Sequence, residues 1–216
     1  MDTQRFRACG FVLVGGQSRR MGRDKALLEF EGRPMLLRMA DLLQPYVGQV
    51  TLLGSPARYS GFGLPVLEDQ SPGQGPLGAL YTGLRNSTCD WNLFFACDLP
   101  HLSRRFVEIL LKRARETSAQ AVVPKAGERW QPLCAAYHRS CLPLMEAVIR
   151  RGENLAVVDL LPLLRVEVLP PEPSVSIRAW EEMFINVNTA GQWEQLQRSE
   201  MKVANENFRR VLAAGK

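Results

Sequence analysis

A short apolar run near the start of the chain ends in a glycine-rich and strongly basic string. Residues 10–14 have the composition of a buried strand, and Gly15 and Gly16 follow them directly. The string then continues through paired arginines to Lys25. Glycines expose backbone N–H groups that can bind phosphate oxygens, and the cations offset the charge of a triphosphate. The string therefore predicts a triphosphate site at the end of this strand.

This string differs from the two common nucleotide-binding motifs. It matches neither Gly-x-Gly-x-x-Gly nor Gly-x-x-x-x-Gly-Lys-Ser/Thr, which disfavours both a dinucleotide-binding fold and a P-loop. An ordinary turn is the alternative for the glycine pair taken alone. The whole string from Leu13 to Lys25 disfavours that alternative.

Runs of strand character alternate with helical periodicity along the rest of the chain. We expect strands at residues 10–14, 49–53, 64–67, 91–96, 120–123 and 184–187, an extended segment at 163–168 and a hairpin at 125–130. We expect helices at residues 34–45, 77–84, 103–114 and 139–150, and another after a cap at Asn188 or Thr189. The alternation predicts a mainly parallel sheet with helices on both faces. One domain over residues 1–200 and a helical tail over 201–216 are expected.

Composition narrows the classes of partner and compartment. The chain has 216 residues and a net charge of +5, with its arginines spread along the sequence, which favours small polyphosphates over nucleic acid. It shows no signal-peptide core and no membrane-spanning apolar stretch, so a cytoplasmic protein without a membrane partner is expected. The five cysteines form no Cys-x-x-Cys pair, so we expect neither a disulfide framework nor a zinc site.

An aspartate follows the most apolar of the predicted strands, residues 91–96. Asp98 would lie at the carboxyl edge of a parallel sheet, where open α/β folds bind ligands, and Pro100 ends the strand. A magnesium ion held by this carboxylate can bridge phosphate oxygens. An aspartate that caps a turn is the alternative.

Two further segments carry polar residues beside glycines or strand ends. Asp69 precedes a loop rich in glycine and proline, residues 72–78, whose glycines permit close approach of a planar base. Asp69 would accept hydrogen bonds from a guanine edge or a ribose, and a flexible surface turn is the alternative. Asn186 and Asn188 fall on one side of the last predicted strand, where Asn188 either contacts a ligand or caps a helix.

These four strings occur in the order found in the molybdenum cofactor guanylyltransferases, a branch of the MobA-like NTP transferases. The chain resembles that family from about Phe11 to Leu196. The resemblance implies a three-layer α/β/α Rossmann-like sandwich of the nucleotide-diphospho-sugar transferase type. It also implies transfer of GMP from GTP to molybdopterin-bound molybdenum, with Mg2+ as cofactor and release of pyrophosphate.

The resemblance assigns roles to individual positions. It implies that the strand end contacts the guanosine nucleotide through Leu13, Val14, Gly15 and Gly16. Arg20 and Lys25 correspond to catalytic triphosphate ligands, and Asp69 to a further nucleotide contact. Asp98 corresponds to the catalytic ligand of magnesium and GTP.

On the acceptor side, Asn186 and Asn188 resemble the family's pair near the pterin, and residues 132–133 with Tyr137 resemble the segment that lines this side. Ala190 replaces the family's usual proline after Asn-Val-Asn-Thr. GTP and molybdopterin are the implied partners, together with molybdenum-insertion proteins and molybdoenzyme apoproteins or their chaperones. A CTP-using sibling, another small-molecule phosphate nucleotidyltransferase and a non-catalytic nucleotide- or cofactor-binding adaptor are the alternatives.

Overall fold

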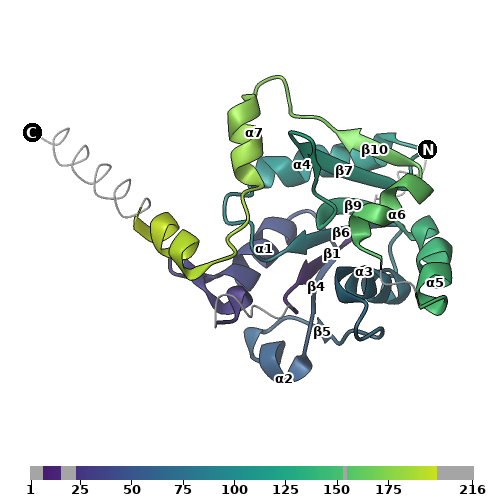
Figure 1. Ribbon diagram of the computed structural model, residues 1–216, viewed down its shortest axis with the longest axis horizontal. Helices are drawn as coiled ribbons and strands as arrows, with labels where there is room; N and C mark the ends of the chain where they lie inside the picture. Colours follow the sequence, from purple (N-terminus) through teal and green to yellow (C-terminus); the bar gives the residue numbers. More distant parts are fainter. Residues whose placement is uncertain (1–6, 16–22, 153–154, 199–216) are drawn as a thin grey trace, which may run out of the picture.

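The computed structural model describes residues 7–15, 23–152 and 155–198 (Figure 1). Its centre is a sheet with the strand order β10-β7-β9-β6-β1-β4-β5, in which β8 pairs with β7. Its strands are β1 Ala8–Leu13, β4 Gln49–Leu53, β5 Val66–Leu67, β6 Trp91–Ala96, β7 Ala121–Ala126, β8 Arg129–Trp130, β9 Cys134–His138 and β10 Val166–Leu169. Strands β2 Glu29–Phe30 and β3 Arg33–Pro34 form a separate antiparallel pair.

Most neighbours in the sheet are parallel, and β9 is the exception inside it. Strand β1 pairs in parallel with both β4 and β6, and β10 pairs in parallel with β7. Strand β9 runs antiparallel to both β6 and β7. The carboxyl ends of β1, β4 and β6 therefore meet at one edge of the sheet, where ligands bind in open α/β folds.

Helices cover both faces of the sheet (Figure 1). They are α1 Met35–Leu43, α2 Pro56–Tyr59, α3 Gly75–Asn86, α4 Arg104–Glu116, α5 Leu142–Arg150, α6 Val157–Leu160 and α7 Ile177–Met183, and residues 190–198 are helical as well. Short 3-10 helices lie at Lys25–Leu27, Ser60–Phe62, Arg139–Cys141 and Leu161–Leu163. Buried side chains of α1, α4 and α7 pack on one face, and those of α3, α5 and α6 on the other. The expected three-layer α/β/α sandwich is confirmed.

Several predicted elements agree closely with the structure. The strands at residues 49–53 and 91–96 have the expected bounds, and β7 and β8 form the expected hairpin. Ser103 caps α4, since its hydroxyl accepts a hydrogen bond from the Phe106 N–H at 3.3 Å. Thr189 caps the helical residues 190–198 in the same way, because its hydroxyl accepts from the Gln192 N–H at 3.2 Å.

The predicted strand at residues 184–187 is wrong. This segment follows α7 without joining a strand ladder, although Phe184 and Val187 are buried in the core. Its one backbone bond to the sheet edge runs from the Val187 N–H to the Asp98 carbonyl at 3.0 Å. Strand β9 and helix α7 were not predicted. The predicted helical tail at 201–216, and with it the domain boundary at residue 200, lies outside the described residues and stays a prediction.

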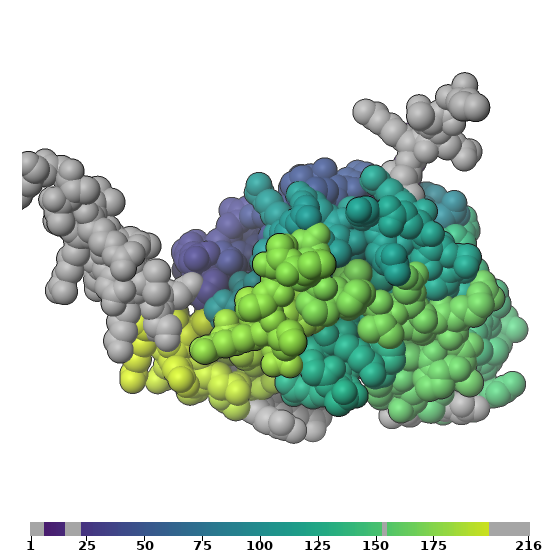
Figure 2. All heavy atoms as spheres, turned by 90° about the horizontal axis from the view of Figure 1, so that it is seen from above, coloured from purple at the N-terminus to yellow at the C-terminus, as the bar shows by residue number. Residues whose placement is uncertain are grey.

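The last part of the chain packs beside α4. Figures 1 and 2 both show α7 and the segment before it on the same side as α4. The Trp180 indole N–H donates to the Lys125 carbonyl at 2.6 Å, and the Trp180 and Phe106 rings lie 5.9 Å apart.

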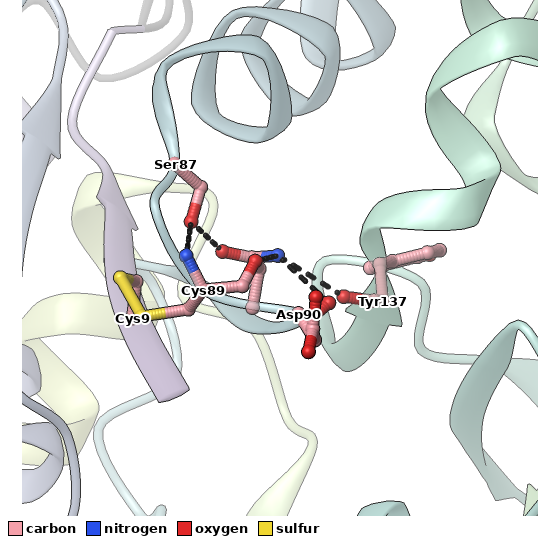
Figure 3. Close-up of a disulfide and its surroundings, with 6 residues drawn as sticks. Cys9, Ser87, Cys89, Asp90 and Tyr137 are labelled. Atoms are coloured by element: carbon pink, nitrogen blue, oxygen red, sulfur yellow. Dashed lines mark hydrogen bonds between the residues drawn. A yellow bond between two sulfur atoms is a disulfide. The ribbon is translucent and has the colours of Figure 1, made fainter. Parts of the chain in front are cut away.

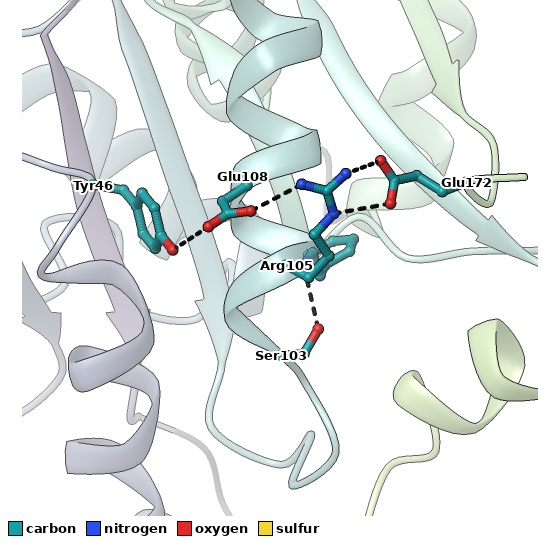
Figure 4. A network of polar contacts seen from close by, with 6 residues as sticks. Tyr46, Ser103, Arg105, Glu108 and Glu172 are labelled. Carbon is teal, nitrogen blue, oxygen red and sulfur yellow. Dashed lines mark hydrogen bonds and ion pairs between the residues drawn. The ribbon is translucent and has the colours of Figure 1, made fainter. Parts of the chain in front are cut away.

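Figure 4 shows a polar network on this side, in which the Tyr46 hydroxyl donates to Glu108. Arg105 binds Glu108 and also Glu172, so the network joins the α1–β4 connection to the segment before α7. No helix among the described residues is long and apolar enough to cross a membrane.

Two cysteines are joined in a disulfide, which corrects the expectation that none pair. Cys9 in β1 is bonded to Cys89 in the turn before β6 (Figure 3), and their Cα atoms lie 5.8 Å apart. Strands β1 and β6 are neighbours, and Cys9 lies opposite Asn92 in the register. The pairing thus depends on strand order across a separation of 80 residues, for which the sequence carries no local signal. Cys97, Cys134 and Cys141 are buried with free thiols.

Reduction of the Cys9–Cys89 bond is expected to lower the free energy of unfolding by about 2–4 kcal/mol, because the bond restricts the unfolded chain. Guanidinium unfolding with and without a phosphine reductant measures this change. The Cys9→Ala/Cys89→Ala double variant is the control, and its stability should not respond to reductant. A wild-type protein that shows five reactive thiols in denaturant before reduction would contradict the prediction.

Candidate active site

A cavity of about 590 Å³ opens at the edge of the sheet where β1, β4 and β6 end. The strand ends contribute Leu13, Val14, Gly15, Leu53, Gly54, Ala96, Cys97 and Asp98 to its lining. The loop before α3 and the start of that helix contribute Gly73, Gly75 and Pro76, and Lys25 enters from the end of the glycine-rich string. Three of the four strings identified in the sequence therefore meet in one cavity, whose volume suits a nucleotide-sized ligand.

The residues that follow β1 are fixed to β4 by backbone hydrogen bonds. The N–H groups of Val14 and Gly15 both donate to the Leu53 carbonyl, at 3.1 and 3.2 Å. A Cβ atom on Gly54 would lie 2.7 Å from a methyl of Val14, so a side chain there would displace the strand end. Leu13, Val14 and Gly15 lie where the sequence placed them. Gly16 and Arg20 lie outside the described residues, and their roles stay predictions.

Asp98 follows the end of β6, and its two carboxylate oxygens have different surroundings. Its Oδ2 lies 3.5 Å from the Lys25 Nζ, and the two side chains are 17% and 19% exposed. Its Oδ1 is buried and has no hydrogen-bond partner among the described residues. Burial raises the pKa of Asp98, and the neighbouring Lys25 ammonium opposes that rise. A buried carboxylate oxygen without a partner is costly, which points to a ligand that binds there.

The residues present fit a magnesium ion that is shared with substrate. Mg2+ prefers oxygen ligands and is commonly bound by one or two carboxylates together with substrate phosphates and water. Asp98 lines the cavity, and its Oδ1, which has no partner among the described residues, is one such oxygen. No group of three or more acidic, histidine or cysteine side chains within the described ranges is arranged to hold a metal. Asp98 therefore suits a metal that arrives with the triphosphate.

Lys25 joins this cavity to a second one. Its Nζ donates to the Asn188 Oδ1 at 2.6 Å, in addition to its ion pair with Asp98. Asn186 and Asn188 both line the second cavity, of about 430 Å³, together with Arg129, Trp130, Gln131, Phe184, Ile185 and Gln192. The side chain of Asn188 thus contacts a site residue, while Thr189 provides the helix cap. Asn186 and Asn188 thus line one cavity, although the strand that was expected to carry them is absent.

Asp69 lines the first cavity but is partly engaged within its own loop. Its Oδ1 accepts from the Ser71 N–H at 2.8 Å and from the Thr82 hydroxyl at 3.2 Å. A Cβ atom on Gly78 would lie 2.7 Å from the Ser71 carbonyl, so glycine is required for this close approach. Thr82 also lines the cavity and is fully buried. One oxygen of Asp69 therefore orders the loop.

Residues 132–133 and Tyr137, which were expected to line the acceptor side together, lie in different surroundings. Leu133 lines the first cavity. Tyr137 does not line either cavity, because it is fully buried in the core and its hydroxyl donates to the Pro132 carbonyl at 2.8 Å. Asp24 and Thr82 line the first cavity and were missed as site residues, as was Tyr59, whose hydroxyl binds Asp24. Asp24 lies within the string from Leu13 to Lys25, whereas Thr82 and Tyr59 make contacts that no local sequence pattern reveals.

The chain is similar in sequence and in fold to known proteins. A family model described as the MobA-like NTP transferase domain matches residues 10–162. A probable molybdenum cofactor guanylyltransferase of Clostridium perfringens is 32% identical over 188 residues, covering 86% of this chain and 93% of that protein. The molybdenum cofactor guanylyltransferase of Shewanella halifaxensis is 30% identical over 202 residues, covering 90% and 94%. The crystal structure of molybdopterin-guanine dinucleotide biosynthesis protein A from Archaeoglobus fulgidus superposes with a TM-score of 0.76 at 23% identity, covering 90% and 99%.

Proposed function

The chain belongs to the MobA-like NTP transferase domain family, and on this premise we propose that it transfers GMP from GTP to the molybdopterin form of the molybdenum cofactor. Pyrophosphate is the other product. The observation that carries the proposal is the Lys25–Asp98 pair on the wall of the strand-end cavity, with the buried Oδ1 of Asp98 left for a ligand. Relatives named as guanylyltransferases over most of their length support the choice of GTP.

The reaction needs little proton chemistry from the protein. A phosphate monoester has a second pKa of about 6, so the acceptor phosphate is largely ionised at neutral pH and attacks without a general base. Its oxygen forms a bond to the α-phosphorus in line, while the bond to the pyrophosphate oxygen breaks. Catalysis therefore consists of positioning and charge stabilisation. Lys25 and Arg20 are proposed to stabilise the charge that builds on the departing pyrophosphate.

Asp98 is the proposed ligand of a magnesium ion. Bound with the triphosphate, the metal would supply positive charge next to the phosphate oxygens. The protein's contribution is to keep the Asp98 carboxylate ionised despite burial, and the Lys25 ammonium at 3.5 Å supports that state. Asp69 is proposed to contact the nucleotide through the oxygen that its loop leaves free, beside the strand end Leu13, Val14 and Gly15.

The second cavity is the proposed place for the acceptor. Asn186 and Asn188 line it, and the hydrogen bond from Lys25 to Asn188 connects it to the triphosphate side. An acceptor phosphate that lies beside Asn188 would approach the α-phosphorus next to Lys25. The amide groups of Asn186 and Asn188 can donate hydrogen bonds to the oxygens of this phosphate. Unlike carboxylates, they carry no negative charge that would repel it. The proposal also includes a cytoplasmic location. The product would pass to molybdenum-insertion proteins or to molybdoenzyme apoproteins and their chaperones.

Calorimetric titration with GTP, CTP, ATP and UTP, each with and without Mg2+, tests the proposal without the unstable acceptor. We expect GTP with Mg2+ to bind about tenfold more tightly than CTP, the effect of about one net hydrogen bond to the base edge. Preference for CTP would move the protein to a cytidylyl branch, and absence of binding to every nucleotide would favour a non-catalytic adaptor. Selective GTP binding would justify the full assay with molybdopterin.

A further inference from the structure

A single buried hydroxyl connects the two described ends of the glycine-rich string. Tyr59, at the end of α2, is only 2% exposed. Its hydroxyl lies 2.7 Å from the Val14 carbonyl oxygen and 2.7 Å from the Asp24 Oδ2. Val14 and Asp24 both line the strand-end cavity, on either side of residues 16–22 in the sequence. Helix α2 belongs to none of the strings that the sequence singled out.

The carboxylate of Asp24 in turn orients the turn that carries Lys25. Its Oδ1 accepts from the Ala26 N–H at 3.0 Å, which caps the short 3-10 helix Lys25–Leu27. The Nζ of Lys25 then reaches Asp98 and Asn188. A chain of contacts therefore runs from Tyr59 through Asp24 to the lysine between the two cavities.

The surroundings of Tyr59 keep its hydroxyl in place and protonated. Gly54 leaves the room that the ring needs, because a Cβ atom there would lie 2.9 Å from the Tyr59 Cε2. Burial raises the pKa of Tyr59, and the hydrogen bond to Asp24 raises it further. The residue is thus a neutral donor throughout the physiological range. The exposed Arg58 lies 3.9 Å from the Asp24 Oδ2 and is a weaker partner.

We propose that Tyr59 is a positioning residue for the nucleotide site, which holds Val14 and Asp24 at a fixed separation and thereby places Lys25 against Asp98. It touches no substrate and acts through Asp24. The inference rests on the proposed nucleotidyl transfer, since it concerns how that site is held in shape. It extends the site to a fifth segment of the chain, the connection between β4 and β5.

A double-mutant cycle between Tyr59→Phe and Lys25→Met tests this proposal. Tyr59→Phe removes the hydroxyl and keeps the ring, and we expect it to weaken binding of GTP with Mg2+ about tenfold, as for a lost hydrogen bond to a charged group. In the Lys25→Met background the same change should weaken binding less than about twofold, because the residue through which Tyr59 acts has gone. Calorimetry measures all four affinities. A purely structural role would weaken binding equally in both backgrounds.

Tyr46→Phe is the matched control. The Tyr46 hydroxyl also donates to a carboxylate, Glu108, at 2.8 Å, but this pair lies in the exposed network beside α4 (Figure 4). Its loss should leave nucleotide affinity unchanged. If Tyr59→Phe does not fold, Asp24→Asn carries the same cycle with Lys25→Met and the same expectation.

The outcomes separate this inference from the proposed function. A wild-type protein that binds no nucleotide would remove the proposed function and the inference with it. A wild-type protein that binds GTP, with Tyr59→Phe equal to wild type or with equal losses in both backgrounds, would overturn the positioning role alone. A tenfold loss that vanishes in the Lys25→Met background supports it.

Discussion

Replacement of Asp98 with asparagine is expected to lower turnover by about 1,000-fold, because an amide cannot supply the negative charge that holds a metal ion beside the triphosphate. The same variant should be no less stable than the wild-type apoprotein. Asparagine keeps the size of the side chain at the end of β6 but removes a carboxylate that burial disfavours. Steady-state kinetics and thermal unfolding of the metal-free protein, measured on the same sample, test both expectations.

The sign of the stability change follows from the direction of the pKa shift. Burial raises the pKa of Asp98 in the folded protein, so the folded state binds the proton more tightly than the unfolded chain does. As pH rises from the unfolded value through the raised value, ionisation of Asp98 therefore lowers the free energy of unfolding. At pH values above the raised pKa the wild-type protein carries that full cost and Asp98→Asn does not. Loss of the counter-charge for Lys25 reduces the gain.

Asp90→Asn provides the matched control, since Asp90 precedes the same strand at its opposite end and is exposed. Its turnover and its stability should equal those of the wild type. If Asp98→Asn turned over at near the wild-type rate, the assignment of Asp98 as metal ligand would be wrong. If it lost activity only because it unfolded, the melting curve would show this directly.

The parts of the fold that the sequence predicted are those with a strong local pattern. Strands β4 and β6 are apolar runs bounded by turn residues, and their bounds were predicted without error. Ser103 stands directly before the periodic residues of α4, as an N-cap does. Strand β9 was missed because its run, Cys134–His138, follows a proline-containing turn and ends at a histidine that also caps a 3-10 helix.

The segment at residues 184–187 shows how an alternating pattern can mislead. Residues 185–188 alternate apolar and polar side chains in the sequence, as a half-buried strand does. In the structure, however, Phe184 and Val187 are buried and Ile185 is exposed, so burial does not follow that alternation. The two buried side chains pack against the core, and the segment makes a single backbone bond to the sheet edge, from the Val187 N–H to the Asp98 carbonyl. Alternation in the sequence therefore does not by itself indicate a neighbouring strand. Helix α7 was missed because only Trp180 of its seven residues is buried.

For the site, the sequence predicted the residues with unusual chemistry and missed those that hold them. Lys25 and Asp98 were expected to act on the same triphosphate, and the structure places them 3.5 Å apart. Tyr59 and Thr82 are ordinary core residues by composition. Their hydroxyl groups bind Asp24 and Asp69 across 35 and 13 residues of sequence. Such contacts depend on the tertiary arrangement, so no spacing in the sequence reveals them.

Replacement of Lys25 with methionine is expected to lower turnover by about 100-fold or more, because it removes a cation from beside the charge that builds on the pyrophosphate. Methionine keeps most of the apolar stem, so the cavity wall should keep its packing. The hydrogen bond to Asn188 and the ion pair to Asp98 are both lost. Single-turnover kinetics with saturating GTP and Mg2+ separate this loss of rate from weaker binding.

The residual activity of Lys25→Met should also change its dependence on pH. The Lys25 ammonium lowers the pKa of Asp98 against the effect of burial, so its removal raises that pKa further. Since Asp98 must be ionised to bind a metal, the acidic limb of the pH–rate profile should move to higher pH. Lys112→Met, which removes an exposed lysine from α4, should leave both the rate and the profile unchanged. A Lys25→Met profile with the wild-type acidic limb would show that the two residues do not interact in the working enzyme.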